Sequence, residues 1–517
     1  MPNSTLPDLL LYNGHFITMD PSLPNAKALA IKEGRIAWIG ETPSEPHAKQ
    51  ILDLKGAYVY PGFIDTHMHL LFAGLVGDYV QLQECPDRES VLVKVEERAL
   101  LSKPGEWVIG VGWDDHYWPV KGGLTAIELD KRAPQNPVMM LRKDSHLMCV
   151  NSLALKIAKI DSATPDPLGG IIARDAQGAP NGILIDAASV EIRNAIPLPI
   201  LCDKVAILQR TLQQCLSRGL TSIHNAATNK NDFEAFHYMA IHGLLPIRLY
   251  AMATVGNSGE NPFFSQGPQD YGPFLQMRCL KLWMDGAMGS RGAALVEPYS
   301  DDPVNRGLLL WEEKELLEVL QKAKAQGFQV AIHAIGDRAS HDVLNAYQKI
   351  GVTGLRWRIE HAQQLLPEDI TRFTQLGVIA SMQPLHYTVD KPWLEHRLGR
   401  DRVLQGAFVW KSLLESGAHV CGGSDAPVVD FNPLLGMHAA ITREGSQKLT
   451  PFEALKMYTQ DAAYACFADN ELGSLAEQKL ADLVILPENI LTCPPENLLD
   501  MPVLYTIVKG EIVYSTS

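Results

Sequence analysis

The middle of the chain repeats one pattern many times: apolar residues at helical spacing, then a glycine, then a short apolar run. In one repeat, Leu316, Leu320 and Ala323 fall on one helical face, Gly327 follows them, and residues 328–333 form the apolar run. Glycine suits the left-handed position that commonly follows a helix, and strands that alternate with helices are typical of parallel β/α units. The pattern therefore predicts an α/β protein with a parallel sheet.

Eight strands of this kind can be placed, which favours a TIM-like (β/α)8 barrel. The alternative is a doubly wound open sheet, but neither G-x-G-x-x-G nor G-x-x-x-x-G-K-[ST] follows the first strand, which weakens it. We expect the barrel strands at residues 63–69, 220–224, 247–254, 279–285, 328–333, 355–361, 378–383 and 418–423.

The two ends of the chain differ from the middle, because their short alternating segments are typical of β-strands. We expect residues 1–60 and 466–517 to form one composite β-sandwich domain. The barrel would then consist of residues 61–78 and 200–465. Residues 79–199 contain tryptophans, prolines and a hairpin-like run, so we interpret them as an α+β insertion after the first barrel strand that could cover the substrate.

Composition restricts the partners. The chain has 517 residues and a net charge of −14, and this acid excess argues against a nucleic acid or an anionic membrane surface as the main partner. We find no apolar stretch of about 20 residues and no signal-peptide pattern. The eight cysteines are scattered and contain no C-x-x-C pair. We therefore expect a cytoplasmic protein that could form a homo-oligomer.

Several residues that commonly bind metal stand at the ends of expected strands. His67 and His69 lie two apart in the segment PGFIDTHMH, so on a strand both imidazoles point to one side, as a metal chelate needs. A single histidine at such a place is more often structural. A cluster of ligand-type residues at one rim of a barrel is far more specific. The other members are His333, His361 and Asp425.

Lys281 is unusual, because it lies within the expected strand 279–285. An inward ammonium beside metal ions would be repelled by them and costly to desolvate. A neutral lysine amine can add carbon dioxide to give a carbamate, whose two oxygens could bridge two metal ions. The charges would then nearly cancel, since carbamate, Asp425 and hydroxide together oppose two divalent ions. The alternatives are a lysine whose amine reaches solvent and one that pairs with Asp285.

A set of motifs in order along the chain resembles the amidohydrolase superfamily, and more closely its amidohydrolase family 3 branch, which includes N-substituted formamide deformylases. The resemblance extends from about residue 8 to residue 514. It implies a TIM-like barrel, a zinc-type centre and hydrolysis of C–N bonds. Its motifs are PGFIDTHMH, Lys281 before DGAMGSRGAAL, HAIGDRA, RIEHAQ, GGSDAP, GWDDHYW and DSHLMCVNSLAL.

The same resemblance assigns roles to the residues that match the motifs. Lys281 would be carboxylated and would bridge two divalent ions, with zinc the expected metal. Asp425 would act both as a ligand and as the catalytic general acid and base. The remaining ligands would be His67, His69, His333 and His361.

The predicted activity is that of a hydrolase acting on carbon–nitrogen bonds other than peptide bonds. A metal-bound hydroxide would attack a small-molecule amide or formamide-like substrate. One alternative is a mononuclear deaminase of a cyclic amine, which would not need Lys281. Another is a regulatory or binding protein that keeps the barrel without turnover.

Contacts to the substrate are the least constrained part of the prediction. The inserted segment contributes three candidates, and the loops after later strands contribute three more. A structural ion pair, an anchor for a loop or a place in the core is the alternative for each of them. The candidates are Trp113, Asp114, His146, Arg291, Arg338 and His386, of which Arg291 could bind a carboxylate through two parallel hydrogen bonds and His386 could stabilise an oxyanion.

Overall fold

The computed structural model of the chain describes residues 6–41, 47–115, 118–119, 123–143, 147–167, 170–256, 263–264 and 266–516. The chain divides into two compact units. One unit joins Met1–Ala73 with Lys204–Ser517, and the other is Gly74–Asp203. The first unit therefore contains both ends of the chain and every residue predicted to bind metal.

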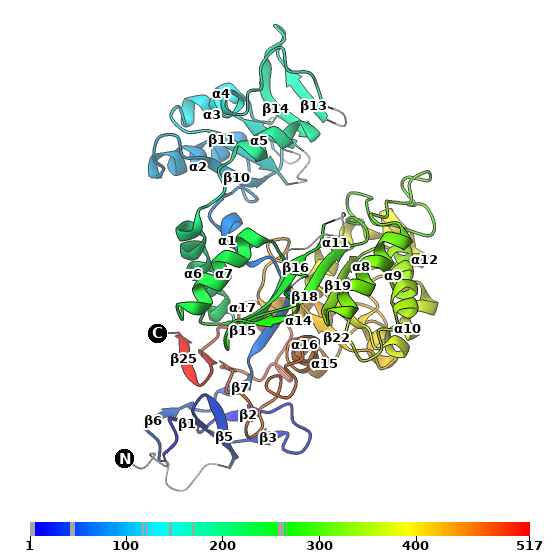
Figure 1. Ribbon diagram of the computed structural model, residues 1–517. Helices are drawn as coiled ribbons and strands as arrows, with labels where there is room; N and C mark the ends of the chain where they lie inside the picture. Colours follow the sequence, from blue (N-terminus) through cyan, green and yellow to red (C-terminus); the bar gives the residue numbers. More distant parts are fainter. Residues whose placement is uncertain are drawn as a thin grey trace. The chain divides into compact units, whose positions relative to one another are not determined.

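Eight parallel strands among the described residues form a nearly closed barrel in the first unit (Figure 1). They follow one another around it in the order β22-β21-β20-β19-β18-β16-β15-β8, and β17 (Gln269–Asp270) adds to β18 in the antiparallel sense. The predicted TIM-like barrel is confirmed, and the doubly wound alternative is wrong. The strands are β8 (Phe63–Met68), β15 (Leu220–Thr228), β16 (Arg248–Thr254), β18 (Leu275–Trp283), β19 (Gln329–Ala334), β20 (Arg358–His361), β21 (Ile379–Met382) and β22 (Val420–Gly422).

Helices flank these strands (Figure 1). In α9 the apolar residues Val343, Leu344 and Tyr347 are buried, and the helix ends before Gly351, which has the left-handed φ of 70°. Among the described residues, none of the helices combines the length and the apolar character needed to cross a bilayer. The helices that lie wholly or partly in this unit are α1 (Leu70–Gly77), α6 (Leu201–Ser217), α7 (Lys230–Ile241), α8 (Glu313–Ala325), α9 (Asp337–Ile350), α10 (Ile370–Leu376), α11 (Pro384–Leu398), α12 (Arg400–Gly406), α13 (Trp410–Glu415), α14 (Pro433–Thr442), α15 (Pro451–Met457), α16 (Gln460–Ala465) and α17 (Asn497–Asp500).

The strand expected at 279–285 is shifted toward the N-terminus and ends at Trp283. Asp285 lies beyond it, where its buried carboxylate accepts backbone N–H groups from Ala294 at 2.8 Å, Ile335 at 3.0 Å and Gly336 at 2.8 Å. The polar backbone of these turns needs an acceptor. The Asp285 side chain therefore shapes the loops after β18 and β19 rather than extending the strand.

The barrel closes where β8 meets β22. The carboxylate of Asp65 accepts the backbone N–H of His67 at 3.0 Å and that of Ser424 at 3.1 Å. The backbone N–H of Asp425 in turn donates to the carbonyl of His67 at 2.6 Å. These bonds bring the end of the first barrel strand beside the segment that follows the last one.

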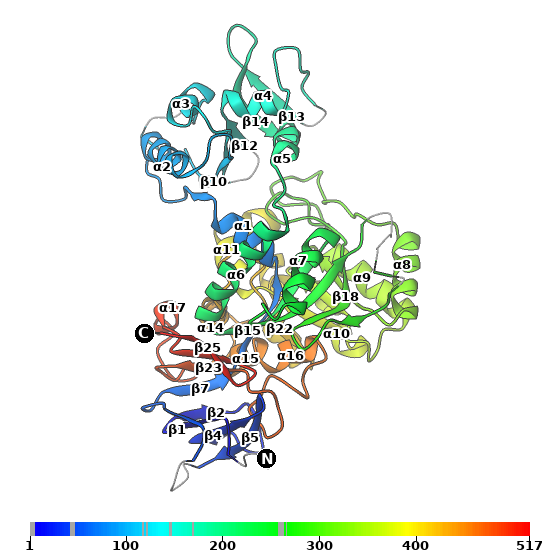
Figure 2. The same ribbon diagram turned by 60° about the vertical axis from the view of Figure 1, so that its left-hand side comes forward.

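Strands from the two ends of the chain form two sheets that share a core (Figure 2). Leu11 and Leu29 of one sheet belong to the same buried cluster as Val59, Leu483 and Ile507 of the other. This is the predicted β-sandwich, although its boundaries with the barrel stay a prediction because both lie in one compact unit. The sheets are β5 (Arg35–Gly40), β4 (Ala28–Lys32), β1 (Leu9–Tyr12) and β6 (Gln50–Asp53), and β25 (Glu511–Ser515), β24 (Tyr505–Val508), β23 (Leu483–Leu486), β7 (Tyr58–Pro61), β2 (His15–Ile17) and β3 (Asn25–Ala26).

The second unit has its own mixed sheet, in the order β13-β14-β12-β11-β10-β9, and its own helices. Its hydrophobic core includes Trp113, Trp118 and Val138. The hairpin-like run predicted in this segment is the antiparallel pair β13 and β14. The elements are β9 (Val80–Gln81), α2 (Arg88–Leu101), β10 (Val108–Trp113), α3 (Ala126–Arg132), β11 (Val138–Arg142), β12 (Leu147–Val150), α4 (Ser152–Ile157), β13 (Gly170–Arg174), β14 (Pro180–Asp186) and α5 (Val190–Ala195).

Candidate metal centre

The residues predicted as metal ligands come from the carboxyl ends of five barrel strands. In barrels of this kind these ends meet at one mouth, where the loops after the strands build the functional site. His67 lies in β8 and His69 directly after it, Lys281 lies in β18, His333 in β19, His361 ends β20, and Asp425 follows β22.

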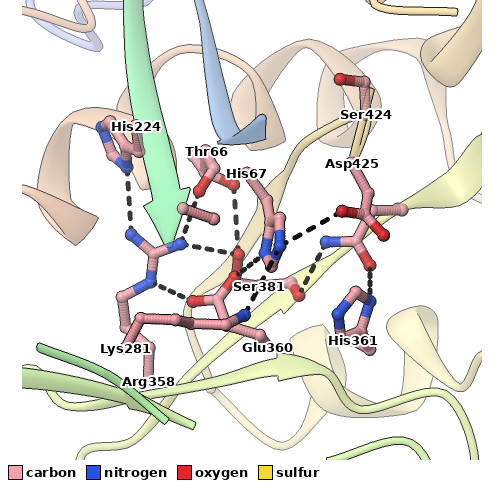
Figure 3. A network of polar contacts seen from close by, with 12 residues as sticks. Thr66, His67, His224, Lys281, Arg358, Glu360, His361, Ser381, Ser424 and Asp425 are labelled. Carbon is pink, nitrogen blue, oxygen red and sulfur yellow. Dashed lines mark hydrogen bonds and ion pairs between the residues drawn. The ribbon is translucent and has the colours of Figure 1, made fainter. Parts of the chain in front are cut away.

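Two of the predicted ligands contact the carboxylate of Asp425, and a third lies against one of them. Nε2 of His69 lies 3.0 Å from Oδ1 of Asp425, and Nε2 of His67 lies 3.4 Å from the same oxygen. Nζ of Lys281 lies 3.5 Å from Nε2 of His67. Side chains from three strands or the loops after them thus meet at one point, as Figure 3 shows for His67, Lys281 and Asp425.

The other two histidines complete the cluster. The ring centre of His361 lies 4.8 Å from that of His67 and 4.4 Å from that of His333. One ligand-type atom from each of His67, His361 and Asp425 lies within 4.8 Å of the other two. Nitrogen and oxygen atoms at such separations could hold a metal ion together.

Hydrogen bonds at Nδ1 fix the orientation of three histidine rings. When Nδ1 makes a hydrogen bond to an acceptor, the neutral imidazole presents its Nε2 lone pair, which is the arrangement found in most histidine ligands of metals. The acceptors are the carboxylate of Glu360 for His67, the carbonyl of Ala226 at 3.1 Å for His69, and Oε1 of Gln383 at 2.8 Å for His361.

His333 fits a metal site in a different way. Its Nε2 is buried, and among the described residues it has no hydrogen-bond partner. The carboxylate of Asp285 lies 3.5 Å away, but its oxygens accept three backbone N–H groups. Buried polar atoms normally have a partner, so a ligand role would satisfy this nitrogen.

Burial keeps His67 and His333 neutral. It lowers the pKa of His67 to about 4 and that of His333 to about 3, with the charge of Lys281 acting in the same direction. Burial raises the pKa of Asp425, but the neighbouring imidazoles of His67 and His69 outweigh it and hold that pKa well below its usual range. Neutral imidazoles and an ionised carboxylate are the forms that bind metals.

Lys281 is 1% exposed, and burial lowers the pKa of its amine to about 8. About a tenth of the amine is therefore uncharged at pH 7. An uncharged amine is the form that reacts with carbon dioxide, so the setting of Lys281 permits carboxylation.

Comparison with known proteins identifies the family of this chain. Residues 50–514 match the family model described as the amidohydrolase family. The chain belongs to the amidohydrolase family. This membership confirms the resemblance found in the motifs and makes the protein a hydrolase that acts on carbon–nitrogen bonds.

Two relatives and one solved structure match this amidohydrolase over nearly its whole length. The putative amidohydrolase YtcJ of Bacillus subtilis is 33% identical over 98% of this chain and 99% of its own. The N-substituted formamide deformylase of Arthrobacter pascens is 28% identical over 98% of both chains. An uncharacterized metal-dependent hydrolase from Pyrococcus horikoshii has a TM-score of 0.81 at 28% identity, covering 94% of this chain and 99% of that one.

Of the predicted substrate contacts, the structure of the amidohydrolase brings His386 to the cluster. His386 lies in the first turn of α11 rather than at the end of a strand. Its Nε2 lies 3.9 Å from Oδ2 of Asp425 and, among the described residues, lacks a hydrogen-bond partner. Arg338 is placed near the mouth at the start of α9, where its Nε lies 3.8 Å from the carboxylate of Asp342.

The structure places two other candidates elsewhere. The two parallel hydrogen bonds expected from Arg291 go to Asp301 within the chain, at 3.1 and 2.9 Å, because this loop carries its own carboxylate. Trp113 is 1% exposed and packs in the core of the second unit, where its indole N–H donates to the carbonyl of Met140. Asp114 lies partly exposed in that unit, and His146 lies outside the described residues.

Sequence reasoning missed a buried polar network beneath the histidines (Figure 3). Arg358 and Glu360 are both fully buried on β20, and Glu360 contacts His67. The available signal was the segment WRIEH itself, in which Arg358 and Glu360 alternate with the apolar Trp357 and Ile359 on an expected strand. Charges at alternate positions of a buried strand point to one interior face.

Proposed function

We propose that this amidohydrolase uses a divalent metal centre at the mouth of the barrel to hydrolyse a C–N bond in a small amide or formamide-like molecule. The observation that carries the proposal is the meeting of His67 and His69 with the carboxylate of Asp425, beside the buried amine of Lys281. Two imidazoles, a carboxylate and an amine gathered in one largely buried place are costly to desolvate and have no evident structural use.

The proposed ligands are nitrogen and oxygen donors only. Zinc accepts both, and the absence of a thiolate from this set argues against a soft-metal site. Lys281, once carboxylated, would be the bridge between two ions. Its Nζ is close enough to Nε2 of His67, at 3.5 Å, for the added carboxylate to reach the same centre. The remaining ligands would be His67, His69, His333, His361 and Asp425.

A divalent ion held here would supply a nucleophile at neutral pH, because it lowers the pKa of bound water, and would polarise the substrate carbonyl. The chain's own residues would handle the proton. Asp425 is ionised and can accept the proton of the attacking water. The same carboxyl can then donate that proton to the leaving nitrogen.

His386 would bind the substrate oxygen. Its Nε2 lies 3.9 Å from Oδ2 of Asp425, so a substrate carbonyl placed against Asp425 would be within reach of the imidazole. A hydrogen bond that strengthens as negative charge develops on that oxygen favours the transition state over the bound substrate.

The relative from Arthrobacter pascens, named an N-substituted formamide deformylase, supports formamides as the first substrates to test. We expect the zinc-loaded protein to hydrolyse at least one compound in a panel of N-substituted formamides, N-acyl amines and cyclic imides. The same preparation stripped with a chelator should be inactive and should recover on adding zinc and bicarbonate. A fully metal-loaded protein that turns over none of the panel would contradict the proposal and favour the regulatory or binding alternative.

A mononuclear deaminase is the competing enzyme activity. It would leave a buried amine beside the ligands without a role, whereas the amine of Lys281 is both buried and adjacent to His67. Amino-substituted heterocycles in the same panel separate the two, because release of ammonia from them without cleavage of any amide would favour deamination.

A further inference from the structure

A buried ion pair lies behind the proposed ligands. Arg358 and Glu360 stand two apart on β20, both side chains are 0% exposed, and Nε of Arg358 lies 2.7 Å from Oε1 of Glu360. Alternate residues of a strand share one face. Arg358 also reaches His224 on β15, which is not a neighbour of β20 in the sheet, so the pair lies in the interior of the barrel.

The guanidinium of Arg358 is held from three further sides. One terminal nitrogen lies 3.0 Å from Nδ1 of His224, and the other donates to the carbonyl of Thr66 at 2.7 Å and to Oγ of Ser381 at 2.8 Å. These partners belong to β15, β8 and β21. A planar group that contacts four partners at once has one orientation available.

Glu360 links this anchored group to the proposed centre. One carboxylate oxygen pairs with Arg358, and the other makes a hydrogen bond with Nδ1 of His67 (Figure 3). A carboxylate that accepts Nδ1–H fixes both the ring orientation and the tautomer of a histidine. Nε2 of His67 then points toward Asp425 and Lys281.

We propose that Arg358 is a positioning residue for the metal centre, which acts through Glu360 to fix the ring of His67 with Nε2 as the lone-pair donor. The proposal rests on the proposed metal-dependent function, since it concerns how tightly the ligand set holds its ion. His224, Thr66 and Ser381 would serve it by holding the guanidinium in place.

A purely structural role is the competing explanation. A buried ion pair is a weak contributor to stability, because desolvation offsets much of the attraction, and its replacement by neutral residues of similar size is often harmless to folding. The two explanations therefore predict different results when the whole pair is exchanged for neutral residues.

The test exchanges the pair as a unit, in the double variant Arg358→Met/Glu360→Gln, which leaves no buried charge alone. The matched control is Arg248→Met/Asp482→Asn. That pair is also an arginine with a carboxylate, at 2.7 and 3.0 Å, with side chains 12% and 2% exposed, but it lies at the beginning of β16, at the other end of the barrel. Zinc affinity is measured by competition with a chelator of known affinity, and thermal unfolding is followed on the metal-free proteins.

We expect the Arg358/Glu360 variant to bind zinc roughly 10- to 100-fold more weakly than the wild type, the usual cost of losing a partner behind a ligand. The Arg248/Asp482 variant should keep wild-type affinity. Arg358→Lys, which keeps the charge but not the planar fork, should recover only part of the affinity of the wild type.

Wild-type zinc affinity in the Arg358/Glu360 variant would overturn the proposal, as would an equal loss in both double variants. Failure of the proposed function looks different, because the wild-type chain itself would then bind no zinc. If the Arg358/Glu360 variant folds less well than the control, the zinc affinity of the Arg358→Lys variant decides between the two explanations. Wild-type zinc affinity in Arg358→Lys would contradict a need for the oriented guanidinium.

Discussion

Nε2 of His69 lies 3.0 Å from Oδ1 of Asp425, although His69 follows the first strand of the barrel and Asp425 follows the last. The contact joins the ends of β8 and β22. It lies beside the two hydrogen bonds that the Asp65 carboxylate accepts from backbone N–H groups. The cluster is therefore complete only when the barrel has closed.

The exchange Asp425→Asn tests the proposed proton transfer. The variant keeps the shape of the side chain but cannot take up a proton, so we expect turnover to fall by about 10²- to 10⁴-fold. Thermal unfolding should change little, and Asp270→Asn, which alters an exposed ion pair, should keep full turnover. An Asp425→Asn enzyme with wild-type kcat would remove the acid–base role.

The exchange Lys281→Ala tests the bridge. Without the carbamate we expect the chain to retain about one divalent ion instead of two, measured by elemental analysis after reconstitution. Short carboxylic acids added to the buffer should restore part of the second ion. Lys204→Met serves as control, because Lys204 is also a buried lysine but bonds to the carbonyl of Asn231, away from the cluster. Equal metal content in both variants would argue against bridging.

The pH dependence of reconstitution follows from the amine of Lys281. Burial lowers its pKa to about 8, so the ammonium form dominates below that pH and the reactive amine dominates above it. With the concentration of dissolved carbon dioxide held constant, activation of metal-free protein by zinc should therefore be roughly 25-fold slower at pH 6.5 than at pH 8.5, in proportion to the uncharged fraction of the amine. The measurement is the rate at which activity returns. A rate independent of pH across this range would contradict carboxylation of Lys281.

The exchange His386→Asn tests the contact to the substrate oxygen. Because Nε2 of His386 lies outside the proposed ligand set but 3.9 Å from Oδ2 of Asp425, the metal content should remain at the wild-type level. We expect kcat to fall by roughly 10²-fold, as when one donor to a developing negative charge is lost. Steady-state kinetics with metal analysis on the same sample check this. A change in KM alone would indicate ordinary substrate binding instead.

The fold was predictable because its signal is local and repeated. Each helical face such as that of Leu316 and Leu320 is followed by a glycine and an apolar run, and each repeat gives one β/α unit of the barrel. The strand 279–285 was misplaced because Leu275–Arg278 continue its alternation while Asp285 belongs to the following turn. The end of a strand thus depends on contacts within the following loop, which the local sequence pattern does not reveal.

The cluster was predictable from the positions of its members at strand ends, but its surroundings were not. The two hydrogen bonds between Arg291 and Asp301 depend on the path of one loop, and the burial of Trp113 depends on packing within the second unit. Glu360 was overlooked beside His361, because nothing local in the sequence reveals that its carboxylate reaches His67 on a distant strand. The cytoplasmic location and a homo-oligomer stay predictions.

The most direct test of the central claim is the metal content of the wild-type chain. Protein purified without chelator, in buffer that contains bicarbonate, is analysed for divalent metals against its concentration. The account predicts about two ions per chain, with zinc restoring the full complement after stripping. Less than one ion per chain, even after reconstitution with zinc and bicarbonate, would contradict it.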